Sequence, residues 1–527
     1  MSIRRKSPAY DIAMKPQPCL LLFVLISSLL PAATVEKKIY PKRWVYVSSS
    51  LANDREVAAV LEVVETAAAH GLNGMVLAGT ADRIDLERPE YFERLKRVKE
   101  LCDRKGVEII PTGFNVGYGG ALLAHDRNLA EGLPVKGALF VVRDGTAVFQ
   151  PEVAAVHVES FGPAARFEKE IGVKPFRSYS VKVRVRGEGV ARDATLEIRA
   201  DTPDRRRNYC WFERALPKES AWHEYTAGFN SASAERLLFN ISIEDGLAGK
   251  LSIADLRIEE VGLVNVVRRA GTPLQVRGEK NGMVYEEDRD YAEIKDPKLN
   301  FRFDHESPSI RLLAGTRIAD GQRLRVDYYH GTTIYRDQVG ACISEPKVFE
   351  IWSKQFPLLQ RYLAPKTYLL ALDEIRMGGS CETCRRRGIS MAKMLGEYAS
   401  RLCDLVHASN PTAEIFVWSD MFDPNHNARS DYYLVEGDYT GSWQYLPKDM
   451  QLACWYYEKR NASLAFFSKL SRHTLGAAYY DADDLSNPRG WLESLDQTPG
   501  AVGIMYTTWQ NKYKLLADFG DLVSKRQ

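Results

Sequence analysis

The sequence has almost no excess of charge of either sign. Its 71 Lys and Arg residues nearly balance its 69 Asp and Glu residues, which leaves a formal net charge of +2. A chain with so little net charge has no global field that would attract nucleic acid or an anionic membrane surface. We therefore expect no nucleic-acid partner. The apolar content of 45% and charged content of 27% are ordinary for a globular protein.

A hydrophobic run of membrane-spanning length is also missing. The apolar run Cys19–Leu30 is too short for a comfortable membrane span. It follows Lys15 and precedes Pro31-Ala32-Ala33, which is the order of a secretory signal peptide. We predict a signal peptide over residues 1–34, a secreted or periplasmic location and no integral membrane domain. A retained amino-terminal anchor is the alternative.

A second CxxC motif is absent as well. The motif that is present, Cys381-Glu382-Thr383-Cys384, would need two more ligands to bind zinc. Loss of the predicted signal peptide leaves seven cysteines, an odd number, so at least one thiol stays free or pairs between chains. In an oxidising compartment Cys381 and Cys384 could form a local disulfide. We expect a structural role for the motif and neither a metal nor another cofactor.

Alternation of apolar runs with amphipathic helical patterns dominates both ends of the chain. Eight runs are predicted as parallel strands: Arg43–Ser48, Asn73–Ala78, Val107–Gly113, Tyr368–Asp373, Glu414–Trp418, Gln451–Trp455, Leu475–Tyr480 and Val502–Tyr506. They close an α/β fold of the (β/α)8 TIM-barrel type if everything from about Phe114 to Glu345 is an insertion between strands three and four. We assign residues 38–133 and 341–527 to the two parts of the barrel.

The middle of the chain changes to a period of two. Residues 134–262 contain predicted strands at Tyr179–Arg186, Ala194–Ala200, Leu237–Ile243 and Lys250–Glu259, which favours a β-sandwich. In this rhythm, in Ser220–Phe229 and in Leu251–Val261, the stretch resembles carbohydrate-binding jelly-roll modules. An insert that serves only as a scaffold is the alternative. Residues 263–340 are β-rich, and they either continue the sandwich or form a rim of the active site.

Candidate site residues stand where the predicted barrel strands end. The stretch Lys366–Ser380 is an apolar run that ends in Asp373 and Glu374, followed by two glycines. The carboxyl ends of barrel strands converge, so we expect further contributions from Trp418, Asp420, Trp455, Tyr480, Asp481, Tyr506 and Trp509, with His330 from the preceding β-rich region. Aromatic rings stack on sugars, and carboxylates hold hydroxyls and move protons. An oligo- or polysaccharide is the predicted substrate.

The acid pair after strand four resembles glycoside hydrolase family 20, the β-N-acetylhexosaminidases. That resemblance implies that Glu374 is the general acid and that Asp373 orients the 2-acetamido group of the substrate, which acts as the nucleophile. It also implies that Trp418, Trp455 and Trp509 wall the sugar pocket and that Tyr480 contacts the acetamido oxygen. The sequence departs from the family in having Leu370-Ala371-Leu372 before the pair, where the family has a His and two glycines.

Two other functions fit the same residues. A glycosidase could use two protein carboxylates, Glu374 as acid and Asp420, Glu345 or Asp481 as nucleophile. A non-catalytic glycan-binding protein could keep the barrel only for its pocket. The sugar, its linkage, exo or endo action and the oligomeric state stay open from the sequence.

Overall fold

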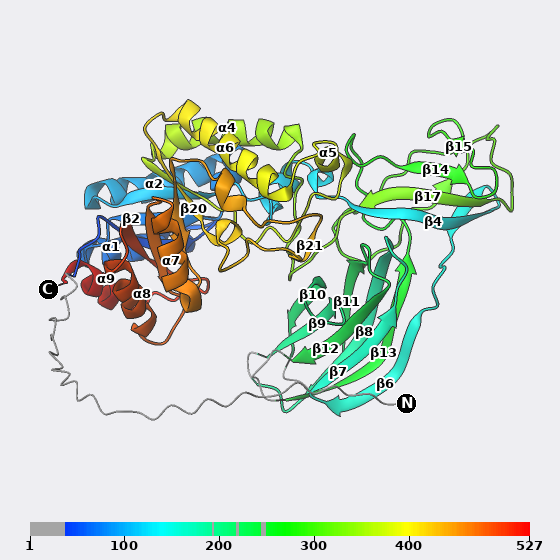
Figure 1. Ribbon diagram of the computed structural model, residues 1–527, viewed down its shortest axis with the longest axis horizontal. Helices are drawn as coiled ribbons and strands as arrows, with labels where there is room; N and C mark the ends of the chain where they lie inside the picture. Colours follow the sequence, from blue (N-terminus) through cyan, green and yellow to red (C-terminus); the bar gives the residue numbers. More distant parts are fainter. Residues whose placement is uncertain (1–36, 192–193, 218–220, 244–248, 527) are drawn as a thin grey trace, which may run out of the picture. The chain divides into compact units, whose positions relative to one another are not determined.

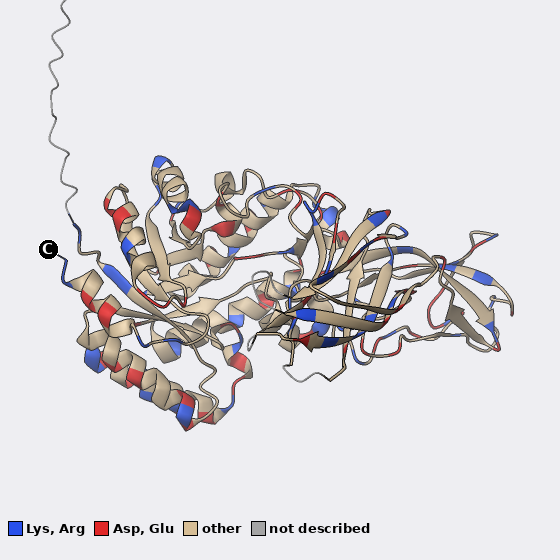
Figure 2. Ribbon diagram, turned by 90° about the horizontal axis from the view of Figure 1, so that it is seen from below, with Lys and Arg blue, Asp and Glu red and all other residues tan. Residues whose placement is uncertain are grey.

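The computed structural model describes residues 37–191, 194–217, 221–243 and 249–526 (Figure 1). The predicted signal peptide, residues 1–34, lies outside these ranges. Within them, no helix combines the length and the apolar character needed to cross a membrane. Basic and acidic residues are interspersed along the helices and strands (Figure 2), as the small net charge suggests.

All eight predicted barrel strands are present. They are β1 (Lys42–Ser48), β2 (Gly74–Ala78), β3 (Glu108–Gly113), β18 (Thr367–Leu370), β20 (Glu414–Trp418), β22 (Met450–Cys454), β23 (Thr474–Tyr479) and β24 (Ala501–Thr507). Hydrogen bonds join them in that order into a closed barrel of parallel strands. The pairing of β3 directly with β18 confirms that the insertion lies between strands three and four.

The strands alternate between the barrel interior and the helical layer. In β1, Trp44 and Tyr46 belong to the interior cluster, whereas Val45 and Val47 belong to the cluster under the helices. The larger helices of that layer are α1 (Asp54–Ala69), α2 (Pro89–Lys105), α4 (Pro346–Leu363), α6 (Met391–Ser409), α7 (Arg460–Lys469), α8 (Ser486–Asp496) and α9 (Leu516–Ser524). The shorter ones are α3 (Gly120–His125) and α5 (Glu382–Arg385).

The insertion holds two β-structures (Figure 1). The β-sandwich has one sheet in the order β10 (Asn208–Ala215), β9 (Thr195–Asp201), β12 (Arg236–Ile243), β7 (Arg166–Gly172) and another in the order β11 (His223–Asn230), β8 (Ser178–Glu188), β13 (Lys250–Val261), β6 (Val156–Ala164). A separate six-stranded sheet has the order β15 (Val284–Tyr285), β14 (Gln275–Gly278), β17 (Arg323–His330), β4 (Leu133–Arg143), β5 (Thr146–Phe149), β16 (Ile310–Arg311).

The predicted start of the sandwich at residue 134 is wrong. Strands β4 and β5 belong to the six-stranded sheet, where β4 pairs with β17, and the sandwich begins at β6. In the sandwich and in the six-stranded sheet alike, side chains alternate between the two faces with a period of two residues. This alternation identifies a strand but does not show which distant strand it pairs with. Residues 263–340 therefore do not continue the sandwich. They supply the other half of the six-stranded sheet and the segment that returns to the barrel.

Candidate active site

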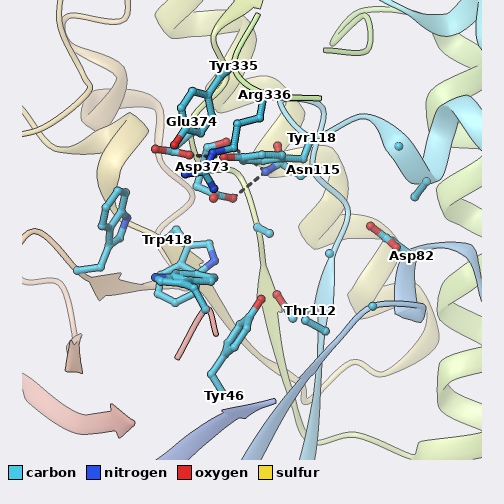
Figure 3. A pocket seen from close by; sticks show the side chains of 18 of the residues that line it. Tyr46, Asp82, Thr112, Asn115, Tyr118, Tyr335, Arg336, Asp373, Glu374 and Trp418 are labelled. Atoms are coloured by element: carbon cyan, nitrogen blue, oxygen red, sulfur yellow. Dashed lines mark hydrogen bonds between the residues drawn. The ribbon is translucent and has the colours of Figure 1, made fainter. Parts of the chain in front are cut away.

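A pocket of about 820 Å³ opens at the carboxyl ends of the barrel strands. Its wall includes seven of the predicted site residues: Asp373, Glu374, Trp418, Trp455, Tyr480, Asp481 and Trp509. Figure 3 shows the Asp373 and Glu374 side chains converging with Tyr118, Tyr335 and Arg336 above the Trp418 ring. The strand-end pattern in the sequence thus predicted residues that the fold does bring together. The pocket size suits a ligand of a few rings.

Asp373 is held by an amide from the neighbouring strand end. The Asn115 side chain donates to the Asp373 carboxylate at 2.7 Å and to its carbonyl oxygen at 3.1 Å. Asn115 is itself fixed because its oxygen accepts the Gly117 N–H at 2.7 Å. Burial raises the pKa of Asp373 well above its usual range, and the negative charges of Asp420 and Glu374 raise it further. The Asp373 carboxyl therefore holds a proton more readily than an exposed aspartate does, and Asn115 fixes its orientation.

Glu374 has a different environment from its neighbour. One carboxylate oxygen forms an ion pair with Arg376 at 2.7 Å, and the other accepts the hydroxyl of Tyr118. Its side chain is 21% exposed, whereas that of Arg376 is 6% exposed. The backbone of Glu374 has a φ of +48°, a left-handed conformation that is costly for a residue with a Cβ. This turn directs the Glu374 carboxylate into the pocket.

A buried network supports the Glu374 carboxylate. Arg376 donates to the Gln338 side chain at 2.7 Å and to the Tyr118 hydroxyl at 3.3 Å. Gln338 also donates to the backbone carbonyls of Gly117 and Glu374, at 3.0 and 2.9 Å. The network therefore links the loop after β3, the loop after β18 and the segment that returns from the insertion.

Asp420 lies beneath this pair and is fully buried. Its carboxylate accepts the Glu374 backbone N–H at 2.9 Å and the Asn427 amide at 2.8 Å, and the Trp455 indole N–H approaches it at 3.4 Å. Burial raises the pKa of Asp420 to about 7. With its oxygens occupied and no exposure, Asp420 positions Glu374 and Trp455, and it does not present a free nucleophile to the pocket.

Aromatic rings form one side of the pocket. The Trp418 ring lies 6.1 Å from that of Trp509 and 6.2 Å from that of Tyr46. The Trp455 and Tyr480 rings are parallel, with centroids 6.3 Å apart. Tyr480 and Trp509 are each 45% exposed, so large apolar surfaces face solvent at the mouth. Exposed rings in a pocket are the usual surface for the CH faces of a sugar.

Asp481 shapes this aromatic wall. Its carboxylate accepts a hydrogen bond from the backbone N–H of Trp509 at 2.8 Å and another from the hydroxyl of Thr508. These two bonds fix the loop after β24. Asp481 and the two residues before it, Tyr479 and Tyr480, all have positive φ values. Three consecutive left-handed residues are strained, and such strain is concentrated at functional sites. Through its hydrogen bond to the Trp509 backbone, Asp481 therefore fixes the position of Trp509 in the pocket wall.

The insertion completes the pocket rim. Tyr335 and Arg336, from the segment after β17, line the pocket. The backbone of Trp211, in the sandwich, pairs with the backbone of this segment. The Trp211 backbone N–H donates to the Ile334 carbonyl at 2.9 Å, and the Trp211 carbonyl accepts from the Arg336 backbone N–H at 3.0 Å. The Trp211 ring lies 5.1 Å from Tyr335 and 4.4 Å from the Arg199 guanidinium. Trp211 therefore supports the rim and is not an open platform for glycan.

Three predicted residues lie outside the pocket. His330 is fully buried on β17 and pairs with Asn230 of the sandwich at 3.0 Å, because the strand turns it toward that domain. Tyr506 points outward, since Met505 occupies the interior position of β24, and its hydroxyl donates to the Lys512 carbonyl at 2.7 Å. Glu345 pairs with Arg269 at 3.2 Å. None of the three is among the residues that line the described pocket.

The local disulfide that the CxxC spacing would allow is not formed between Cys381 and Cys384 in the structure. Cys381 and Cys384 are both buried thiols in the structure, and Cys342 approaches the two of them. The helix α5 begins directly after Cys381, which turns both sulfurs to the same side.

Sequence reasoning missed Asn115, Tyr118, Arg376 and the pair Tyr335-Arg336. Asn115 and Tyr118 follow β3, and the strand-end rule used for the other strands would have found them had the insertion not been assumed to begin at Phe114. Arg376 stands two residues after Glu374, so spacing alone gave a signal. Tyr335 and Arg336 come from a loop whose position depends on the insertion, and no local pattern marks them.

No protein-family model and no curated protein matches this sequence. Solved structures do show similarity. A chitobiase from Flavobacterium johnsoniae is 8% identical, with 92% of this chain and 48% of that chain covered and a TM-score of 0.38. A β-N-acetylhexosaminidase from Bacteroides fragilis is 8% identical, with 92% and 64% covered and a TM-score of 0.39. This chain therefore spans about half of the first and less than two thirds of the second.

Smaller matches fall on a quarter of the chain. A CBM4 structure is 14% identical, with 26% of this chain and 83% of that chain covered and a TM-score of 0.17. All these TM-scores lie below 0.5, so the similarities assign neither a substrate nor catalytic residues. The chain is a closed (β/α)8 barrel with a large β-insertion, and it is similar over most of its length to solved β-N-acetylhexosaminidases.

Proposed function

We propose that this protein is a secreted glycoside hydrolase that cleaves a terminal 2-acetamido sugar with retention of configuration. The observation that carries the proposal is the Asp373–Glu374 pair, held at one strand end and turned into a pocket whose opposite side is Trp418, Trp455 and Trp509. Sugar-cleaving sites need a proton donor, a group that stabilises the cationic transition state and surfaces that hold the ring.

Glu374 acts as the general acid in this proposal. Its partly exposed carboxylate reaches the pocket, and Tyr118 and Arg376 fix its direction. Asp373 accepts the N–H of the acetamido group and aligns its oxygen for attack on the anomeric carbon. The hydrogen bond from Asn115 occupies one Asp373 oxygen and leaves the other for the substrate.

The placement of the three candidate protein nucleophiles, Asp420, Asp481 and Glu345, supports the substrate's own amide as nucleophile. Asp420 is buried with its oxygens engaged, Asp481 accepts from the Trp509 loop, and Glu345 lies away from the pocket in an ion pair. None of these three offers a free carboxylate opposite Glu374. A mechanism with a protein nucleophile would need one of them to leave its present hydrogen bonds.

A second assignment exchanges the two roles. The raised pKa of Asp373 favours it as proton donor, while Glu374, which is paired with Arg376, would then be the group that orients the acetamido substituent. Comparison of Glu374→Gln with Asp373→Asn on substrates whose leaving groups differ in acidity separates these assignments.

The experiment for the function itself is a panel of aryl glycosides. We expect turnover of aryl 2-acetamido-2-deoxyglycosides and at least a roughly 100-fold lower kcat/KM for the matching 2-hydroxy sugars, because only the acetamido substrates carry the nucleophile. Equal turnover of both series would contradict the substrate-assisted mechanism. Binding of glycans without turnover of any aryl glycoside would show a non-catalytic protein.

A further inference from the structure

Four buried side chains outside the pocket gather around one point. The Glu131 carboxylate and the thiols of Cys342, Cys381 and Cys384 have ligand atoms that all lie within 4.8 Å of one another, and all four residues are buried. The Cys342 sulfur lies 3.4 Å from that of Cys381 and 3.7 Å from that of Cys384. A disulfide would need about 2.05 Å. Sulfurs on a tetrahedral zinc ion, with bonds of about 2.3 Å, stand roughly 3.8 Å apart.

The Glu131 carboxylate points independently to a cation at this cluster. One oxygen accepts the Ser380 N–H at 2.8 Å, the Ser380 hydroxyl at 2.9 Å and the Cys381 N–H at 3.0 Å. The other oxygen is buried and has no hydrogen-bond partner among the described residues. A fully buried carboxylate oxygen without a partner is strongly unfavourable unless a cation lies beside it. The three bonds to the first oxygen hold the second in place as a metal ligand would be held.

We propose that Glu131, Cys342, Cys381 and Cys384 bind a structural Zn²⁺ ion. Three thiolates select a soft or borderline ion over magnesium or calcium, and four protein ligands leave no open position for a substrate. Cys342 and Glu131 are the two ligands that the spacing of the CxxC motif does not show, because they come from segments far apart in the sequence.

Charge around the cluster is consistent with this ion. Three thiolates and a carboxylate carry four negative charges, of which Zn²⁺ neutralises two. Arg269 lies next to the cluster, where its guanidinium also donates to the carbonyls of Asn128 and Ala130 at 2.6 and 2.7 Å. The two negative charges that remain lie beside the fixed, buried guanidinium of Arg269, which makes them tolerable in a protein interior.

The location explains what the ion would do. Glu131 stands where the chain leaves the barrel for β4, and Cys342 stands where it returns to α4. Cys381 and Cys384 follow the loop that carries the acid pair and Arg376. Zinc would therefore fasten both ends of the insertion to the active-site loop. It would also keep three neighbouring thiols from oxidising in an oxidising compartment such as the one we propose for this protein.

The test is metal content, measured by plasma mass spectrometry on the purified full-length chain. We expect one zinc per chain, and we expect Cys384→Ser and Cys342→Ser to lose most of it. Cys403→Ser removes a buried thiol outside the cluster and is the matched control, which should keep its zinc. Glu131→Gln should release zinc to a chelator faster than the wild-type protein, because a neutral amide is a weaker ligand for Zn²⁺ than a carboxylate, whereas Glu345→Gln, beside Arg269 but outside the cluster, should not.

Two measurements on the wild-type protein keep the test valid if the variants fold poorly. Cobalt substitution should give thiolate-to-metal charge-transfer absorption. The thiol count in denaturant with chelator should be the same before and after reduction. A gain of two thiols on reduction, together with no bound zinc, would show a disulfide and overturn the proposal. These readouts do not depend on turnover, so they succeed or fail separately from the proposed hydrolase activity.

Discussion

Replacement of Asp420 by asparagine should change how the stability of the barrel depends on pH. The Asp420 carboxyl has a pKa of about 7 in the folded chain, because it is fully buried, against about 3.9 when unfolded. The folded state therefore binds more protons than the unfolded state between these values, and stability falls as the pH rises through this window. Three pKa units correspond to about 4 kcal/mol.

That free energy gives a measurable shift in melting temperature. With an unfolding entropy of about 2 cal/mol/K per residue, 4 kcal/mol is roughly 4 °C if the whole described chain unfolds together and about 7 °C if the barrel unfolds alone. The amide that replaces the Asp420 carboxyl keeps an oxygen for the Glu374 N–H and the Asn427 amide, and only the weak contact with Trp455 is given up. Asp420→Asn should therefore gain stability relative to wild type as the pH rises from 4 to 8.

The assay is scanning calorimetry of both proteins across this pH range. The difference between variant and wild type is the quantity to follow, because burial lowers the pKa of His330 and of His426 to about 4, and these residues make stability rise with pH. Asp483→Asn, which removes a fully solvated carboxylate, controls for the loss of one charge. A constant difference between Asp420→Asn and wild type from pH 4 to 8 would refute the reasoning.

Four further variants test the assignments around the pocket. Trp509→Ala should raise KM about 10-fold through lost stacking. Tyr506→Phe, which loses the bond to Lys512, should cost about 1 kcal/mol of stability and leave KM unchanged. A matching rise in KM for both variants would place Tyr506 in the pocket. His330→Leu should lower the melting temperature by leaving Asn230 underpaired, with kcat and KM unchanged, and a fall in kcat at constant stability would contradict its structural role. Trp211→Ala should raise KM several-fold, because Trp211 does not line the pocket itself but packs against Tyr335, which does. Wild-type kinetics would show that the sandwich does not order Tyr335.

The barrel was predictable because its signals are local. Each strand is a short apolar run, each helix follows with a period of 3.6, and the ends of the runs placed Asp373, Glu374 and the three tryptophans at one mouth. The limits of that approach appear where pairing is long-range. Strand β4 looks like a sandwich strand but pairs with β17, far along the chain, with Val135 opposite Tyr328.

Side chains that depend on such pairing could not be predicted. His330 and Tyr506 have the composition of site residues, but the direction of a strand side chain depends on register, and both point away from the pocket. The Cys342 and Glu131 side chains meet the CxxC motif only because both ends of the insertion return to one place. The spacing of the CxxC motif therefore drew attention to two of the four residues and left a disulfide between them possible, whereas the structure has both as free thiols in a cluster with Cys342.

The most direct test of the central claim is the leaving-group dependence of Glu374→Gln. If Glu374 is the general acid, the variant should lose about 100- to 10,000-fold in kcat/KM on aryl 2-acetamido glycosides with poorly acidic leaving groups and much less on those with strongly acidic ones, which need no protonation. Asp373→Asn should lose activity equally on both kinds of substrate. The same uniform loss for Glu374→Gln, with the leaving-group dependence appearing in Asp373→Asn instead, would contradict the assignment of Glu374 as the acid.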